Sequence, residues 1–214
     1  MKEIRLDYNS EEIQYLSKCD KRLGKVISMI GPISYKLYDD PFAFLVHEIV
    51  EQMLSKAAAE KIYTRLFDLC DGKLNPENIL NLEEDKIRKA GVSSAKVKYI
   101  KALSYEVATG SLNFTILNDM PDKEVVKALT RVQGIGNWTA KMYLIFVLNR
   151  LDVLPFEDGA FLQSFSWLYK IEQPTREDII KKCKKWSPYS SIAARYLYKT
   201  LDMGYTKEAF HLFR

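Results

Sequence analysis

The stretch "VQGIGNWTAK", residues 132–141, decides the fold of this chain. Two glycines flank an isoleucine, and helical patterns lie on both sides, so we expect one helix to end near Thr130 and another to begin at Asn137. Glycine allows positive φ and close approach by a partner. The stretch therefore predicts either a plain turn between two helices or a hairpin whose backbone holds a ligand.

Physical chemistry favours an anion as that ligand. The amides of Gly134, Gly136 and the first helical turn, which includes Thr139, have no acceptor within the helix. They point outward with the positive end of the helix dipole, which makes a seat for a phosphate. Ile135 is expected to plug the hairpin between the two helices. Such a seat recognises a nucleic-acid backbone rather than its base sequence.

The length and the net charge of the chain constrain its domain number and its partner only loosely. The 214 residues suffice for one large domain or two small ones. A net charge of +4 is compatible with a polyanionic partner but does not demonstrate one.

Several classes of site and location are disfavoured. Three scattered cysteines without a CxxC pair argue against a disulfide framework and against a four-cysteine iron–sulfur cluster. Neither histidine, His47 or His211, sits in a ligand-spaced cluster, so no zinc site is expected. The sequence shows no signal peptide and no apolar run long enough for a bilayer. We expect a cytoplasmic protein.

Helical periodicity dominates the rest of the chain, which predicts an all-α fold. Residues 42–53 place Phe42, Leu45, Val46, Ile49, Val50 and Met53 on one apolar stripe. "KEIRLDY" and "ISYKLY" are either short strands or extended segments. The lysines at 96, 98 and 101, and the run "KKCKK" at 181–185, favour solvated helix faces.

An acidic residue follows the second helix of the hairpin. Asp158 opens a helix in "FEDGAF", and taken alone it is best interpreted as a helix cap. Together with the preceding hairpin, it becomes a candidate catalytic carboxylate.

The run "RVQGIGNWTAKMYLIFVLNRLDVLPFEDGAF", residues 131–161, resembles the helix-hairpin-helix DNA glycosylases. The likeness is greatest to the alkylation-repair branch, the 3-methyladenine DNA glycosylases of the bacterial inducible type. Four further segments are similar to that branch, and they extend the resemblance over about residues 15–205: "LSKCDKRLGKVISMIGP", "DPFAFLVHEIVEQMLSKAAA", "GVSSAKVKYIKAL" and "KKWSPYSSIAARYLY". We expect no counterpart of the extra N-terminal β domain of some members.

The resemblance implies an all-α fold of two helical lobes with the active-site cleft between them. Residues 1–214 would form a single glycosylase unit. Lobe one would span about 36–120, and lobe two about 1–35 together with 121–214. The helix-hairpin-helix motif would occupy about 122–150.

The resemblance also implies residue roles. Asp158 matches the catalytic aspartate, and Gly134 and Gly136, with Thr139, match the phosphate-binding hairpin. Met53 falls at the wedge that fills the gap left by an extruded nucleotide, with Leu54 as the alternative. Two sets complete the site: a base pocket of Trp138, Tyr198 and Met142, and a monovalent cation at the carbonyls of Thr130, Val132 and Ile135.

At four positions this chain differs from some or many members of the family, which bears on the roles given above. Trp138 stands where bifunctional relatives carry a lysine nucleophile, which argues against strand cleavage. Gln133 replaces a common proline, Ser190 replaces the usual arginine of the closing segment, and Met142 replaces a pocket tyrosine of some relatives. The substrate range among alkylated purines therefore stays open.

The expected function is a monofunctional DNA glycosylase that flips and removes alkylated purines from damaged double-stranded DNA. We expect a monomer that needs no cofactor. A non-catalytic helix-hairpin-helix module that binds DNA or senses damage is the alternative. An oxidised-guanine glycosylase/lyase is disfavoured because it needs a lysine at position 138.

Overall fold

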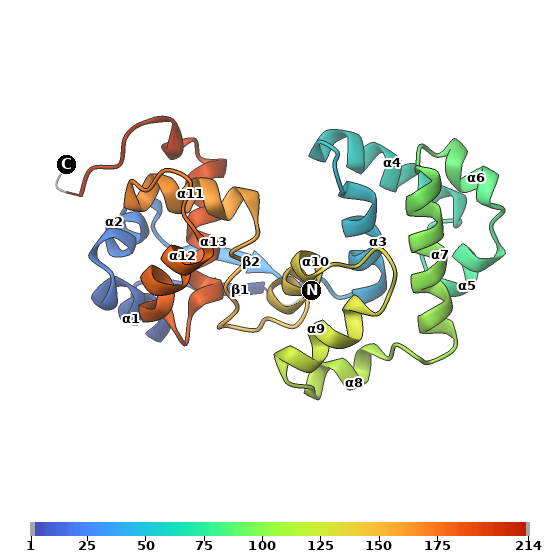
Figure 1. Ribbon diagram of the computed structural model, residues 1–214, viewed down its shortest axis with the longest axis horizontal. Coiled ribbons are helices and arrows are strands. Elements are labelled where there is room, and N and C mark those ends of the chain that lie inside the picture. The colour runs from blue at the N-terminus through green and yellow to red at the C-terminus, as the bar shows by residue number, and fades with distance from the viewer. Residues whose placement is uncertain (1–2, 213–214) are drawn as a thin grey trace. The chain divides into compact units, whose positions relative to one another are not determined.

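The computed structural model describes residues 3–212 and is almost entirely helical (Figure 1). The chain forms two compact units. The terminal unit comprises Met1–Leu37 and Asn149–Arg214, and the middle unit comprises Tyr38–Leu148. Among the described residues, no helix is both long and apolar enough to cross a bilayer.

The terminal unit contains these elements: β1 (Glu3–Leu6), α1 (Glu11–Cys19), α2 (Lys21–Ile30), β2 (Ile33–Lys36), α11 (Gly159–Tyr169), α12 (Arg176–Cys183), the 3-10 helix η1 (Lys184–Trp186), α13 (Ser190–Asp202) and the 3-10 helix η2 (Tyr205–Lys207).

The middle unit contains these helices: α3 (Pro41–Glu51), α4 (Lys56–Leu69), α5 (Pro76–Asn81), α6 (Glu84–Lys89), α7 (Ser94–Ala108), α8 (Phe114–Asp119), α9 (Asp122–Thr130) and α10 (Asn137–Phe146).

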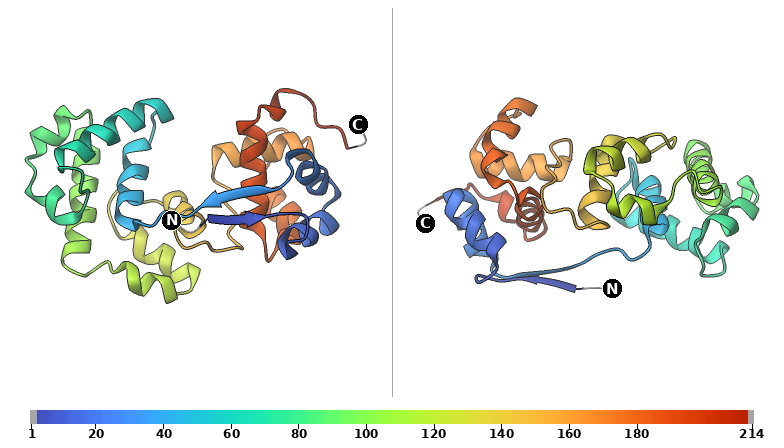
Figure 2. Two further views of the ribbon diagram at one scale, coloured as in Figure 1. Left: turned by 180° about the vertical axis from the view of Figure 1, so that it is seen from behind. Right: turned by 90° about the horizontal axis from the view of Figure 1, so that it is seen from below.

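The two candidate strands pair with each other. β1 and β2 form a two-stranded antiparallel ribbon in which Glu3 lies opposite Lys36 and Leu6 opposite Ile33 (Figure 2). Leu6 and Ile33 are buried. The ribbon is a small addition to a helical protein, so the expected all-α class is confirmed.

A buried carboxylate organises the terminal unit. Asp20 caps α2 by accepting hydrogen bonds from the amides of Arg22 and Leu23. It also accepts from the Trp186 indole at 3.0 Å and from the Tyr169 phenol, and it pairs with Lys185 at 3.1 Å. Burial alone would raise the pKa of Asp20, but these donors hold it below its ordinary value. The network joins α2, α11 and η1 around one core.

The apolar stripe of α3 builds the core of the middle unit. Asp40 caps the helix through the Ala43 amide at 2.9 Å, and Pro41 occupies the first turn. The stripe residues from Phe42 to Val50 are buried. They pack α3 against α4, α7 and α10.

The second boundary between the units differs from the expected one. It lies after Leu148, whereas lobe two was expected to resume near residue 121. α10 packs on α9 and α3, and its side chains Tyr143 and Ile145 are fully buried. Apolar burial therefore assigns both hairpin helices to the middle unit.

Candidate functional site

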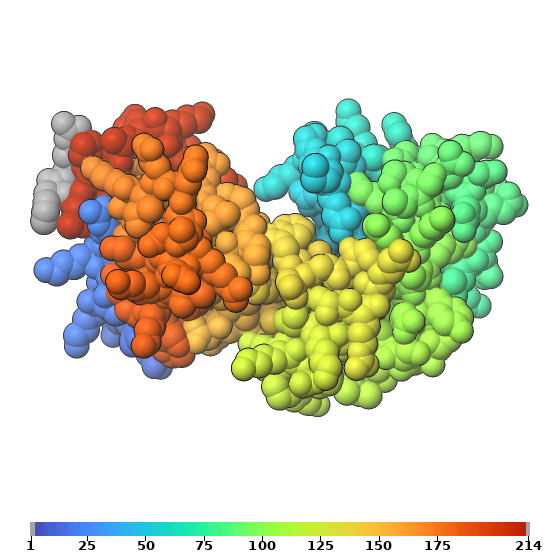
Figure 3. All heavy atoms as spheres, viewed as in Figure 1, coloured from blue at the N-terminus to red at the C-terminus, as the bar shows by residue number. Residues whose placement is uncertain are grey.

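The glycine hairpin forms where the sequence predicts it. α9 ends at Thr130, α10 begins at Asn137, and the Ile135 amide donates to the Val132 carbonyl at 3.1 Å. Ile135 is buried, so it plugs the hairpin as expected. The segment containing α9 and the hairpin, yellow in Figure 3, lies at the visible surface of its unit.

The two glycines meet different physical demands. Gly134 has φ of +92°, and a Cβ there would lie 2.3 Å from Cγ of Tyr99 on α7. Gly136 has ordinary φ, and a Cβ there would meet nothing within 4 Å. The first glycine is required by the fold, whereas the second leaves open space over the start of α10.

The start of α10 has no cap from a side chain. Gly136 is its N-cap residue, and within residues 3–212 the amides of Gly134, Gly136 and Asn137 donate to no acceptor. Free amides at a helix start attract an anion. Thr139, expected at the same phosphate-binding hairpin, is buried, with only 2% of the residue exposed.

The three carbonyls expected to hold a cation lie along the same hairpin. The Val132 carbonyl accepts from the Ile135 amide. A carbonyl oxygen has two lone pairs, so this bond leaves it able to bind a cation. Oxygen donors of this kind suit a hard cation.

Met53 stands apart from the rest of its stripe. It directly follows Gln52, the C-cap of α3, its exposed fraction is 101%, and its φ is +57°. Met53 therefore does not pack in the core with the other residues of the stripe. A non-glycine residue in the left-handed region costs about 1–3 kcal/mol and tends to occur at functional sites. Leu54 is 40% exposed, so Met53 is the more available side chain.

Two side chains that sequence reasoning did not assign hold this turn. Gln52 donates from Nε2 to the Gly134 carbonyl at 2.9 Å. Lys96 donates from Nζ to the carbonyls of Val50 and Gln52. The solvated role expected for Lys96 is wrong, as it is for Lys101, which donates to two carbonyls elsewhere. The sequence signal was weak, because only the position of Lys96 in the first turn of its helix was unusual.

Asp158 caps α11 in the terminal unit. Its Oδ1 accepts from the Phe161 amide at 2.7 Å, and the residue is 8% exposed. Next to it, a Cβ on Gly159 would meet nothing within 4 Å, so the helix start is open. The cap interpretation is confirmed, because Oδ1 holds the first turn of α11.

The loop that precedes Asp158 is fastened to the start of α13. Asp152 accepts from the hydroxyls of Ser187 and Ser190 at 2.5 Å each. The Val153 amide donates to the Ser191 hydroxyl at 2.9 Å. Ser190 therefore has a structural role, because it helps to fix the chain leading to Asp158.

The proposed pocket residues are divided between the units. Trp138 is half-buried in the first turn of α10, and Met142 is buried one turn later. Tyr198 is half-buried on α13 of the terminal unit. Asp158, the buried N-cap of α11, belongs to the same unit. α11 and α13 pack together. Met53 and the hairpin belong to the middle unit with Trp138.

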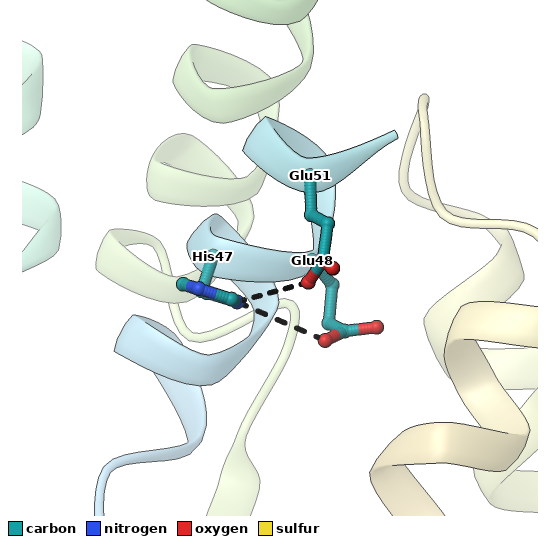
Figure 4. Close-up of side chains that lie close together, drawn as sticks. All are labelled: His47, Glu48 and Glu51. Carbon is teal, nitrogen blue, oxygen red and sulfur yellow. Dashed lines mark ion pairs between the residues drawn. The ribbon is translucent and has the colours of Figure 1, made fainter. Parts of the chain in front are cut away.

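A cluster of ionisable side chains lies on α3, close in sequence to Met53 (Figure 4). Nδ1 of His47 lies 3.9 Å from Glu48 and 3.7 Å from Glu51, and Nε2 lies 3.6 Å from Glu60. A hydrogen bond to Glu48 is the largest cause that raises the His47 pKa. Ligand atoms of His47, Glu48 and Glu51 lie within 4.8 Å of one another, which the sequence did not predict. These carboxylates account for the raised pKa, and they form ion pairs with His47 when it is protonated.

Comparisons with known proteins show the family of this chain. The model of the family described as HhH-GPD superfamily base excision DNA repair protein matches residues 46–188. The DNA-3-methyladenine glycosylase 1 of Schizosaccharomyces pombe is 29% identical over 87% of this chain and 84% of its own.

Solved structures give the same result. A DNA-3-methyladenine glycosidase from Bacillus halodurans is 34% identical, with a TM-score of 0.87 over 98% of this chain and 97% of that one. The Schizosaccharomyces pombe 3-methyladenine DNA glycosylase, solved in complex with abasic DNA, is 26% identical, with a TM-score of 0.82 over 90% of this chain and 97% of that one.

Proposed function

The chain belongs to the HhH-GPD superfamily of base excision DNA repair proteins, and from that premise we propose that it removes alkylated purines from double-stranded DNA without cutting the strand. It is a base excision repair glycosylase, a hydrolase of N-glycosidic bonds. The relatives named for 3-methyladenine support this class of lesion.

The exposed Met53 is the observation that carries the proposal. An enzyme that acts on a base has to take it out of the stack. An apolar side chain can replace the lost stacking because it needs no hydrogen bonds in the gap. Met53 is fully exposed on a turn bonded to the glycine hairpin, so it can enter the gap while the hairpin amides hold a phosphate.

Asp158 supplies the chemistry. An alkylated purine such as 3-methyladenine carries positive charge and leaves readily, which gives the sugar oxocarbenium character. A carboxylate stabilises that cation or directs a water onto the anomeric carbon. The hydrogen bond from the Phe161 amide fixes one oxygen of Asp158 and thereby orients the other.

The pocket residues account for base selection. Trp138 and Tyr198 attract a cationic base by stacking and by cation–π interaction, worth about 0.5–2 kcal/mol each. Met142, one turn after Trp138 on α10, is the third residue proposed to contact the base. Because Trp138 takes the place of the lysine nucleophile, no Schiff base forms and the strand stays intact.

The proposed enzyme needs no cofactor and no iron–sulfur cluster. A monovalent cation at the carbonyls of Thr130, Val132 and Ile135 would support the hairpin and add positive charge near the phosphate. The proposed partner is damaged double-stranded DNA bound by a monomer. The proposed location is the cytoplasm, at the nucleoid if the source is bacterial.

Incubation with randomly methylated DNA tests the proposal. We expect chromatography to detect free 3-methyladenine, and a denaturing gel to show intact strands until alkali cleaves the abasic sites. Strand breaks that appear without alkali would contradict the monofunctional assignment. Tight DNA binding without base release would favour the non-catalytic module.

A further inference from the structure

The end of α3 is held by a lysine from another helix. Lys96 donates to the carbonyls of Val50 at 2.8 Å and Gln52 at 2.6 Å, the residues on either side of the last helical position. Lys96 lies in the first turn of α7, where the helix dipole disfavours a cation, and burial lowers its pKa. The Lys96 ammonium is instead stabilised at the C-terminus of α3, because it donates to carbonyls there. The contact with α3 therefore accounts for the position of the Lys96 side chain.

The same turn is bonded to the hairpin. Gln52, next to Met53 in the chain, donates from Nε2 to the Gly134 carbonyl at 2.9 Å. This hydrogen bond joins residues 82 positions apart. A displacement of the Met53 turn would therefore break a bond to the hairpin.

α7 also contacts the hairpin directly. Tyr99 lies one turn after Lys96 and packs against Gly134 so closely that a Cβ there would lie 2.3 Å from the ring. α7 thus holds the Met53 turn through Lys96 and the hairpin through Tyr99.

We propose that Lys96, Gln52 and Tyr99 are positioning residues that fix the spacing between Met53 and the phosphate seat. This inference rests on the proposed function, because the spacing matters only if Met53 fills a gap in DNA. A phosphate and the adjacent gap have a set separation in a duplex. A side chain that enters the gap has to be held at a matching distance, which the contacts around a functional group normally provide.

Lys101 provides a matched control on the same helix. It donates to the carbonyls of Leu80 at 2.9 Å and Leu82 at 2.5 Å, at the end of α5. Burial also lowers its pKa. Lys96→Met and Lys101→Met therefore each remove an ammonium that donates to two backbone carbonyls. The Lys96 contact lies beside Met53, whereas the Lys101 contact lies where no DNA contact is proposed.

The test compares two duplexes, one with a single abasic-site analogue and one intact. We expect Lys96→Met to lower the preference for the abasic duplex about tenfold, since a displaced group loses its contact steeply with distance. Lys101→Met should keep the wild-type preference within about twofold, and thermal melting should show both variants folded. Gln52→Ala, which removes only the hydrogen bond to the hairpin, should also lower the preference for the abasic duplex. This variant replaces Lys96→Met in the test if Lys96→Met does not fold.

A double-mutant cycle excludes a merely structural role. Met53→Ala should lose the same preference, and Lys96→Met should add little to it, because both act through one contact. Lys96→Arg, which keeps the charge and the donors, should restore part of it. Equal losses in Lys96→Met and Lys101→Met, or additive losses with Met53→Ala, would overturn the positioning role alone. Absence of any abasic preference in the wild-type protein would overturn the proposed function as well.

Discussion

Two helix starts in this protein use the same backbone dipole in opposite ways. α11 begins at Asp158, whose carboxylate accepts the Phe161 amide and brings a negative charge to the helix start. α10 begins at Gly136, which offers no side chain, and within residues 3–212 the amides of Gly136 and Asn137 donate to no acceptor. The first start suits a developing cation, as on a sugar, and the second suits a phosphate.

The largest expected effect concerns the charge at α11. Asp158→Asn should slow base release from methylated DNA about 10²–10³-fold, because it removes the charge that stabilises the transition state. Asparagine caps a helix as well as aspartate does, so the melting temperature should hardly change. Single-turnover release of 3-methyladenine measures the effect.

A second capping aspartate is the matched control. Asp40 caps α3 through the Ala43 amide at 2.9 Å, so Asp40→Asn makes the same chemical change at another helix start. It should leave base release at the wild-type rate. Wild-type release in the Asp158→Asn variant would remove Asp158 from the mechanism.

The next effect is on stability. Gly134→Ala should lower the free energy of unfolding by about 2–4 kcal/mol, because it combines a left-handed backbone with a clash against Tyr99. Gly136→Ala, in open space at ordinary φ, should cost less than about 1 kcal/mol. Denaturant unfolding of the pair distinguishes them, and equal losses would refute the difference between the glycines.

A third change converts one helix start into the other type. Gly136→Asp places a carboxylate on the free amides of α10, which should preserve stability but weaken binding to intact duplex DNA about tenfold. The slope of log affinity against log salt should become less steep by about one. Gly136→Asn, a neutral cap, should lose less affinity. Unchanged affinity and slope in the aspartate variant would eliminate the phosphate seat.

The smallest effect is a background charge effect away from both helix starts. The carboxylates of Glu48, Glu51 and Glu60 raise the His47 pKa above its ordinary 6.5. A raised folded-state pKa stabilises the protein fully below pH 6.5, and this contribution is lost as pH rises through the folded value.

His47→Gln should therefore lower the melting temperature at about pH 5.5 and leave it unchanged at about pH 9. The expected loss in the free energy of unfolding at the lower pH is less than about 1 kcal/mol. His211→Gln, at an exposed position of the terminal unit, is the control. An equal loss at both pH values would attribute the effect of His47 to packing against Tyr63 rather than to charge.

Much of the fold was predictable because its determinants are local. The caps at Asp40, Ser93 and Asp158 act on amides three residues away, so the sequence alone places these helix starts. The hairpin followed from its two glycines in the same way. The second boundary between the units was missed because it depends on what α10 packs against, which periodicity does not reveal.

The same difference between local and long-range determinants applies to the candidate site. The sequence predicted the hairpin from its two glycines, whereas the roles of Asp158 and Met53 were implied by the family resemblance. Only the tertiary structure decided that Met53 is exposed, and that Lys96 and Gln52 hold its turn through contacts spanning 46 and 82 residues. A helical pattern fixes which side of a helix is apolar, but the partner of a polar side chain depends on where the chain returns in space.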